Sequence, residues 1–361
     1  MIGSPHTRRH FVRNCAGTAA FLAASRSALS FPALRSTATF RFGVFSLFQP
    51  QRLMLRSDEP LLLSFDDATP ALLQAGNPLS IQFAPHHRLT LQWSSRTVTI
   101  SRLCATATSG EAATFALSVP PPALHGSITR SFSGTLELTA ASHFLQPVII
   151  MQREAAVVCI VHAESPPAAS LAYLAAQAIV SRSFLSAAHT GHFGFDFCDT
   201  THCQFFREAP AAGSPILLAL QQTQNLCLVA SAEPLAAMYS RSCSGHTHTL
   251  AELGLPAGPY PYYSVVCEYC LHHPERWSHS LPHGALPLSE RDRLAYNRIH
   301  GWSALPSVSF TANATGVSGR GIGHGIGLCQ RGTASMAKSG SSAQQILSHY
   351  YPDTALASLP A

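Results

Sequence analysis

Residues 154–207 read EAAVVCIVHAESPPAASLAYLAAQAIVSRSFLSAAHTGHFGFDFCDTTHCQFFR, and this stretch holds the most informative pattern in the chain. Residues 155–161 (AAVVCIV) are rich in β-branched side chains without helical spacing, which predicts a buried strand. Ser165 can cap a following amphipathic helix that has Pro166 at its first position. Glu164 is therefore expected between a strand and a helix N-terminus, either as a favourable charge on the helix dipole or as a rigidly held, partly desolvated acid.

Four residues of metal-ligating type follow within twelve positions, in the pattern H-x5-C-x3-H-C. They are His192, Cys198, His202 and Cys203. Zinc in a tetrahedral site favours this set, and four protein ligands would make the site closed and structural. His189 is an alternative to His192, and a Cys198–Cys203 disulfide beside exposed histidines is the alternative to a metal.

The N-terminus predicts export. Residues 7–13 (TRRHFVR) form a twin-arginine element before a short, weakly apolar run, so residues 1–30 are expected to be a signal peptide of the twin-arginine route. The mature protein would then work in the periplasm or elsewhere outside the cytoplasm, with any metal loaded before export. No later stretch is long and apolar enough to span a bilayer.

The rest of the composition fits one large or two ordinary globular domains, since 46% of the 361 residues are hydrophobic and only 11% are charged. Four of the formal +5 charges are arginines within the first thirty residues, which leaves about +1 for the remainder. We therefore do not expect a nucleic-acid-binding surface. Residues 37–150 contain short alternating runs about ten residues apart, which predicts a β-rich region.

A second group of cysteines has several interpretations. Cys267 and Cys270 form a CxxC pair in what we expect to be a Pro/Tyr-rich loop, and Cys243 lies in the small-residue loop RSCSGHTHT. Together they suggest a second zinc site, a disulfide with one free thiol, or a redox pair, and we favour a disulfide or metal staple between the two segments. A nearby histidine can complete a ligand set; the candidates are His246, His248, His272 and His273.

Residues 319–327 (GRGIGHGIG) carry glycine at every odd position, which does not match the spacing of a dinucleotide fingerprint. In an extended conformation one face would be bare backbone and allow close approach of a packed helix or of a flat ligand such as a sugar ring. Two helices are expected next. The first ends at Gly340, and the second begins at Ser341 or Ser342 and stops before Pro352.

Four elements in order resemble the SpoIID/LytB family, named for the stage II sporulation protein D and an amidase enhancer. They are the strand–glutamate–helix segment ending in LAAQAIVSRSFL, the FDFCDTTHCQFF segment, the SRSCSGHTHT loop, and GHGIGLCQRGTASMAKSG with its closing helix. The resemblance spans about residues 130–356. It implies an α+β protein in which a β-rich N-terminal part precedes a mixed α/β core, which we place at residues 151–356.

The resemblance also implies a function on peptidoglycan. Catalytic members of the family are lytic transglycosylases that cleave glycan strands stripped of stem peptides, and their catalytic glutamate corresponds to Glu164. In catalytic members of the family a zinc ion is bound in the corresponding region, so the resemblance implies zinc at the His192–Cys203 cluster. Family positions of the glycan groove or its scaffold correspond to Ser244, Thr247, His324, Gln177, Arg182, Gln330 and Tyr350. This sequence departs from the family pattern at His246, where many members have glycine, and at Cys329, which is often serine.

Two other functions compete with the transglycosylase. One is a glycan-binding enhancer of a cell-wall amidase, which would bind the same strands without cleaving them. The other is an envelope-assembly factor that neither binds nor cleaves glycan.

Overall fold

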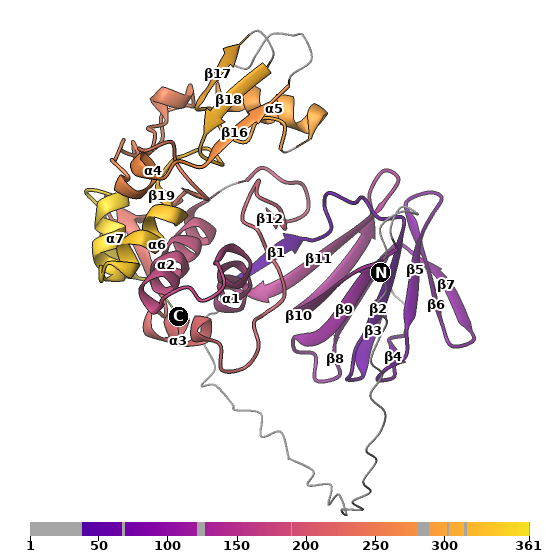
Figure 1. The fold of residues 1–361 in the computed structure, drawn as a ribbon. Coiled ribbons are helices and arrows are strands. Elements are labelled where there is room, and N and C mark those ends of the chain that lie inside the picture. Colours follow the sequence, from indigo (N-terminus) through magenta and orange to yellow (C-terminus); the bar gives the residue numbers. More distant parts are fainter. Residues whose placement is uncertain are drawn as a thin grey trace, which may run out of the picture. The chain divides into compact units, whose positions relative to one another are not determined.

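The computed structural model of the chain describes residues 38–66, 69–120, 127–188, 190–280, 289–301, 303–313 and 316–360. The predicted signal peptide and His189 lie outside these residues. The fold is α+β with a β-rich N-terminal part, as predicted (Figure 1). None of the described helices is long and apolar enough to cross a membrane.

The β-rich part follows the predicted runs. Its strands are β1 (Thr39–Gly43), β2 (Arg52–Arg56), β3 (Leu61–Phe65), β4 (Ala71–Leu73), β5 (Leu79–Ala84), β6 (Arg88–Trp93), β7 (Arg96–Ile100), β8 (Arg102–Ala107), β9 (Ala113–Val119), β10 (Ile128–Ala140) and β11 (Leu145–Gln152). Buried and exposed residues alternate along most of them, because successive side chains of a strand point to opposite faces.

The strands form one curled sheet of mostly antiparallel pairs in which β10 is shared by two sets of neighbours (Figure 1). The first half of β10 pairs with β9, and its second half pairs with β8 and β11. Gly134 lies at this change of partner, where a side chain would strike the carbonyl oxygen of Ile150. At the far edge, the two-residue strand β12 (Phe197–Cys198) joins β1 in parallel.

The remaining elements belong to the second part of the chain. The helices are α1 (Arg153–Glu164), α2 (Leu171–Ala187), α3 (Pro215–Gln222), the 3-10 turn η1 (Ala251–Leu253), α4 (Glu268–His272), α5 (Glu290–His300), α6 (Gln330–Lys338) and α7 (Ala343–Tyr350). The strands are β13 (Leu226–Ala230), β14 (Glu233–Pro234), β15 (Tyr239–Ser240), β16 (Arg276–His279), β17 (Phe310–Asn313), β18 (Gly316–Arg320), β19 (Leu328–Cys329) and β20 (Ala355–Ser358).

The strand predicted at residues 155–161 is wrong, because these residues lie in the middle of α1. Eight of the twelve residues of α1 are buried, so the helix has almost no polar face. Its apolar run therefore shows no helical period, and in sequence it resembles a buried strand. The following helix also begins later than predicted: Ser170, not Ser165, caps α2 by accepting a hydrogen bond from the Tyr173 amide. Glu164 is therefore the last residue of one helix and does not precede the first turn of the next.

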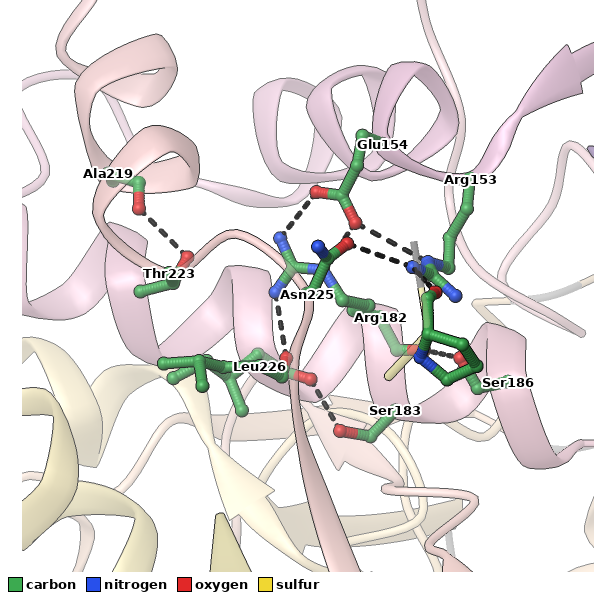
Figure 2. A network of polar contacts seen from close by, with 11 residues as sticks. Arg153, Glu154, Arg182, Ser183, Ser186, Ala219, Thr223, Asn225 and Leu226 are labelled. Atoms are coloured by element: carbon green, nitrogen blue, oxygen red, sulfur yellow. Dashed lines mark hydrogen bonds and ion pairs between the residues drawn. The ribbon is translucent and has the colours of Figure 1, made fainter. Parts of the chain in front are cut away.

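Helix α2 is the central element of the second part, and it packs against α1, α3, α6 and α7 (Figure 1). A buried ion pair fixes it to α1 (Figure 2). Arg182 donates two hydrogen bonds of 2.7 Å to the carboxylate of Glu154, and both side chains are completely buried. Arg182 also donates to the carbonyl oxygen of Leu226, which ties β13 to the same pair.

The two C-terminal helices agree with the sequence. Ser342 and Gln345 form a reciprocal capping box at the start of α7, and Gly340, with a φ of 91°, follows the end of α6. The CEYC segment differs from the prediction, because Glu268, Tyr269 and Cys270 begin the short helix α4 and do not lie in a loop.

Candidate functional site

Glu164 sits at the C-terminal end of α1 and is partly buried. Its Oε1 accepts a hydrogen bond of 2.8 Å from the backbone amide of Phe205. Its Oε2 accepts one of 3.3 Å from the side-chain amide of Gln330, which also donates to the Glu164 carbonyl oxygen at 3.2 Å. Two neutral donors from distant parts of the chain therefore fix the orientation of this carboxyl group.

Burial raises the pKa of Glu164 above its ordinary value of 4.5, and the hydrogen bonds from the Phe205 amide and the Gln330 side chain, together with the nearby Tyr239 hydroxyl, oppose that rise. The end of α1 acts in the same direction as burial, because the negative pole of a helix disfavours a nearby anion. This reverses the sequence-based expectation that a helix N-terminus lowers the pKa. The environment thus favours the protonated form, as a general acid requires.

A network of amides and hydroxyls lies next to this carboxyl group. The Gln330 amide also approaches the Gln177 oxygen at 3.4 Å, and Gln177 donates to the Ser181 hydroxyl. Tyr239 donates to the side chain of Gln204, whose amide reaches the Ser181 carbonyl oxygen. All of these partners are uncharged, and within the described residues Glu164 forms no ion pair.

The first His/Cys cluster brings the four predicted ligand atoms together. The atoms offered by His192, Cys198, His202 and Cys203 all lie within 4.8 Å of one another. The Cys203 sulfur lies 3.1 Å from His192 Nε2, 3.4 Å from His202 Nδ1 and 3.5 Å from the Cys198 sulfur. In a tetrahedral zinc site, two sulfurs lie about 3.8 Å apart and a sulfur and a nitrogen about 3.6 Å apart. The residues therefore fit a zinc ion.

The same loop is fixed to the β-rich part through Asp199. Its carboxylate accepts hydrogen bonds from the Phe45 amide at 2.8 Å and from Arg130 at 2.7 Å, and the side chain is buried. The pairing of Cys198 with Gly43 extends the sheet at this edge. The cluster thus connects the sheet edge to the segment that reaches Phe205 and Glu164.

Four of the predicted groove or scaffold residues are buried and brace the fold. Gln177, Arg182 and Thr247 have no exposed surface, and Tyr350 is 1% exposed. The Thr247 hydroxyl donates to the carbonyl oxygen of Tyr263 and accepts from the Val265 amide, which closes its own loop. Burial excludes direct contact between these four side chains and a glycan in this conformation.

Ser244 and His324 are partly exposed and line a common space that is too small for a water-sized group. The His324 ring accepts a hydrogen bond from the Ile326 amide, and burial lowers the pKa of His324 to about 4, so its neutral form prevails. The ring also bonds to the backbone of Tyr239, whose hydroxyl belongs to the Glu164 environment. His324 is therefore linked to the candidate acid Glu164 only indirectly, through Tyr239.

The glycine-rich segment 319–327 packs against residues 238–248 of the same chain. The predicted partner, a helix or a sugar ring, is therefore wrong. Gly321, Gly323, Gly325 and Gly327 adopt φ values of 80°, 101°, 69° and 66° and do not form an extended strand. A side chain on any of the four would meet residues 238–248 at less than 3 Å. The glycines are needed so that the small-residue loop can approach, and neither a helix nor a sugar ring takes that place.

The second cysteine group contains a residue that the sequence interpretation missed. The sulfurs of Cys243, Cys267, Cys270 and Cys329 lie within 4.8 Å of one another, and all four residues are buried. Cys329 had been noted only as a replacement for serine. The sequence did contain a signal for this role. Cys329 replaces the serine often found before Gln330 in the family signature, and an extra cysteine can supply the fourth ligand that Cys243, Cys267 and Cys270 lack.

A cavity in the second part of the chain lies away from Glu164. It has a volume of about 340 Å³ and is lined by His246, His248, Glu252, Leu253, Ser289, Glu290, Val308 and Ser309. The hydrogen-bond partners of Glu164, Phe205 and Gln330, do not belong to this lining. The carboxyl group therefore lies outside this cavity.

Comparison with known families identifies part of the chain. Residues 142–229 match the family model described as Stage II sporulation protein, SpoIID. The chain carries a SpoIID domain. The match contains Glu164 and the first His/Cys cluster, whereas the four buried cysteines lie beyond its end. No curated protein matches the chain.

The SpoIID domain agrees with the predicted family and is consistent with a cell-wall-related function. Within this domain the structure joins a partly buried, pKa-raised carboxyl group to a loop that fits a metal ion. This arrangement can supply general acid and base catalysis at one residue.

Proposed function

We propose that the protein is an exported lytic transglycosylase that cleaves the glycan strands of peptidoglycan. Its substrate would be the β-1,4 bond between N-acetylmuramic acid and N-acetylglucosamine in strands without stem peptides. The proposal extends the cell-wall theme of the SpoIID domain to a reaction, and it rests on the chemistry available at Glu164.

Glu164 would act twice. As an acid it donates its proton to the glycosidic oxygen while the bond from that oxygen to C1 breaks and the sugar develops oxocarbenium character. As a carboxylate it then removes the proton of the C6 hydroxyl, whose oxygen attacks C1 and forms the 1,6-anhydro ring. The proton returns to Glu164, no water is consumed, and no second carboxylate is required.

The observation that carries this proposal is the difference between two glutamates on one helix, of which Glu154 is fully buried and Glu164 is partly buried. Glu154 is held by the Arg182 guanidinium and also lies 3.4 Å from Arg153, so its carboxylate is committed to a structural ion pair (Figure 2). Glu164 receives only neutral donors, and burial raises its pKa. A carboxyl group with that environment keeps its proton to a higher pH than an exposed glutamate, as a general acid requires.

A zinc ion held by His192, Cys198, His202 and Cys203 would complete the proposed site. Four protein ligands leave no open position, so the ion would hold the loop in shape and take no direct part in the chemistry. Because Phe205 follows this cluster by two residues and donates to Glu164, a fixed loop keeps that donor in place.

Export by the twin-arginine route is also proposed and rests on residues 7–13 alone. A folded, metal-loaded protein suits that route. The natural substrate would then be reached on the outer side of the cytoplasmic membrane.

The test is digestion of denuded glycan strands and identification of the new sugar ends. We expect 1,6-anhydro ends from the parent protein, and we expect Glu164→Gln to reduce their rate by about a hundredfold to ten-thousandfold, the usual contribution of a general acid or base. Glu208→Gln changes an exposed carboxylate of the same segment and serves as the control.

Retained glycan binding by Glu164→Gln would show that the lost rate is not lost folding. If the parent protein binds strands, forms no anhydro ends and stimulates a cell-wall amidase, the transglycosylase is refuted in favour of the enhancer. A protein that neither binds nor cleaves glycan would refute both.

A further inference from the structure

We propose that Cys243, Cys267, Cys270 and Cys329 bind a second zinc ion in a closed tetrathiolate site. The site does not depend on the proposed activity, because it lies outside the matched domain segment and uses none of the residues discussed for catalysis.

The geometry of the four sulfurs fits one tetrahedral ion. All lie within 4.8 Å of one another, and the sulfurs of Cys270 and Cys329 are 3.5 Å apart. Edges of about 3.8 Å are expected around zinc with four thiolates. Three separate segments supply these sulfurs: the small-residue loop, the CEYC segment at the start of α4, and β19 next to α6. Such convergence over 86 residues of sequence is not produced by local chain geometry.

Hydrogen-bond donors point at the sulfurs as they do at metal-bound thiolates. The amides of Cys243 and Gly332 approach the Cys329 sulfur at 3.4 and 3.5 Å. The hydroxyl of Tyr350 approaches the Cys267 sulfur at 3.5 Å. Thiolates that ligate a metal are regularly stabilised by donors outside the first shell. Four neutral thiols would have little need for three such donors in a buried site.

The surroundings leave no position for a further ligand. The four cysteines are between 0 and 2% exposed. A methyl group on Gly332 would overlap both the Tyr350 hydroxyl and the Cys267 sulfur, so the helix backbone itself packs against the site. A closed, buried site with four protein ligands is the form that structural zinc takes.

The described cysteines are all free, so the structure does not favour the disulfide interpretation. A redox pair also fits poorly, because a thiol that exchanges disulfides must be reached by its partner, and the CEYC pair is covered. Zinc is preferred to iron because it has no redox chemistry that would disturb a structural site, although four thiolates can hold either metal.

The consequence of this ion would be a fixed position for Gln330, the residue that follows Cys329 and donates to Glu164. The same ion would join the loop carrying Ser244 to helices α4 and α6. Gln330 would thus be a positioning residue whose own position depends on the tetrathiolate site.

Metal content tests the site without any measurement of activity. The full chain is purified without chelator, and its metals are measured by native mass spectrometry and elemental analysis. We expect two zinc ions per chain in the parent and one in Cys329→Ser. Cys227→Ser is the control because Cys227 is buried but belongs to neither cluster, and it should retain both ions.

Cobalt substitution of the parent provides a second measurement that does not depend on the folding of Cys329→Ser. A tetrathiolate site adds a strong thiolate-to-cobalt charge-transfer band, and the His/Cys cluster alone, with two thiolates, gives about half of that per ion. Parent protein with a single zinc ion, with iron in place of the second zinc, or with a disulfide among these four cysteines would overturn the proposal.

Discussion

The two thiol clusters differ in how the chain assembles them. The His192–Cys203 cluster comes from one loop, at the point where β12 joins the edge of the sheet, and His202 is exposed. The tetrathiolate cluster comes from three segments, and all of its members are buried. A local cluster can be predicted from spacing alone, whereas a cluster assembled by the tertiary fold cannot. The difference also predicts unequal contributions to stability.

Both clusters nevertheless end beside the same carboxyl group. Phe205 follows Cys203 by two residues and donates to Oε1 of Glu164, while Gln330 follows Cys329 directly and donates to Oε2. The candidate acid is thus held from two sides, each next to a proposed metal site. Loss of one cluster should therefore affect catalysis through a different donor than loss of the other.

The largest expected effect is on stability, from Cys270→Ser compared with His202→Ala. Structural zinc contributes about 10 kcal/mol or more to folding in small zinc domains, and Cys270 belongs to the buried core. We expect the midpoint of thermal unfolding to fall by about 10 °C or more in Cys270→Ser, since about 1 kcal/mol corresponds to about 2–4 °C at this size. His202→Ala, at an exposed loop, should lose less than half as much.

Differential scanning calorimetry of both variants checks the ranking, with Cys227→Ser as the control for placing serine at a buried position. If His202→Ala proved as destabilising as Cys270→Ser, the loop cluster would be part of the folding core and the contrast between the two clusters would be lost.

The same contrast explains what the sequence could predict. The β-rich part, both C-terminal helices and the four residues of the local cluster follow from periodicity, capping residues and spacing, which are short-range signals. Cys329 could not be joined to Cys243 in this way, because only the left-handed glycines at 321–327 bring β19 against the small-residue loop.

The prediction of a strand in place of helix α1 was wrong for a related reason. Its apolar residues are buried by the sheet on one side and by α2 on another, so tertiary packing removed the polar face that would have revealed a helical period. The error also reversed the expected effect of the helix dipole on Glu164. Glu164 therefore stays a prediction as the catalytic acid, and the helix dipole acts on its pKa in the opposite direction to the one expected from the sequence.

An intermediate effect is expected from Gln330→Met, which removes the donor on the tetrathiolate side. The hydrogen bond from Gln330 lowers the pKa of Glu164, so its loss should raise that pKa and move the alkaline limb of the pH profile of kcat/KM to higher pH. We expect the maximum rate to fall about ten- to hundredfold because the acid is less well positioned.

Tyr173 and Tyr239 also face Glu164 and remain in this variant; burial raises the pKa of both, so neither titrates near neutral pH. Gln221→Met, at an exposed position of α3, is the matched control. A reduced rate with an unmoved alkaline limb would mean that Gln330 supports the fold without acting on the Glu164 proton.

The smallest effect is the contribution of Glu164 to the pH dependence of the protein's stability, which is measured without substrate. Because the pKa of Glu164 is raised in the folded state, the folded protein binds more protons than the unfolded chain between the two pKa values, and its stability falls as pH rises through that window. Glu164→Gln lacks this titration, so the unfolding midpoint of the variant relative to the parent should increase as pH rises through the window between the two pKa values and level off above it. Glu208→Gln, whose carboxylate is exposed, should show no such trend. A relative midpoint that decreases with pH would mean that the carboxylate is stabilised in the fold, and the two neutral donors would then outweigh burial at this site.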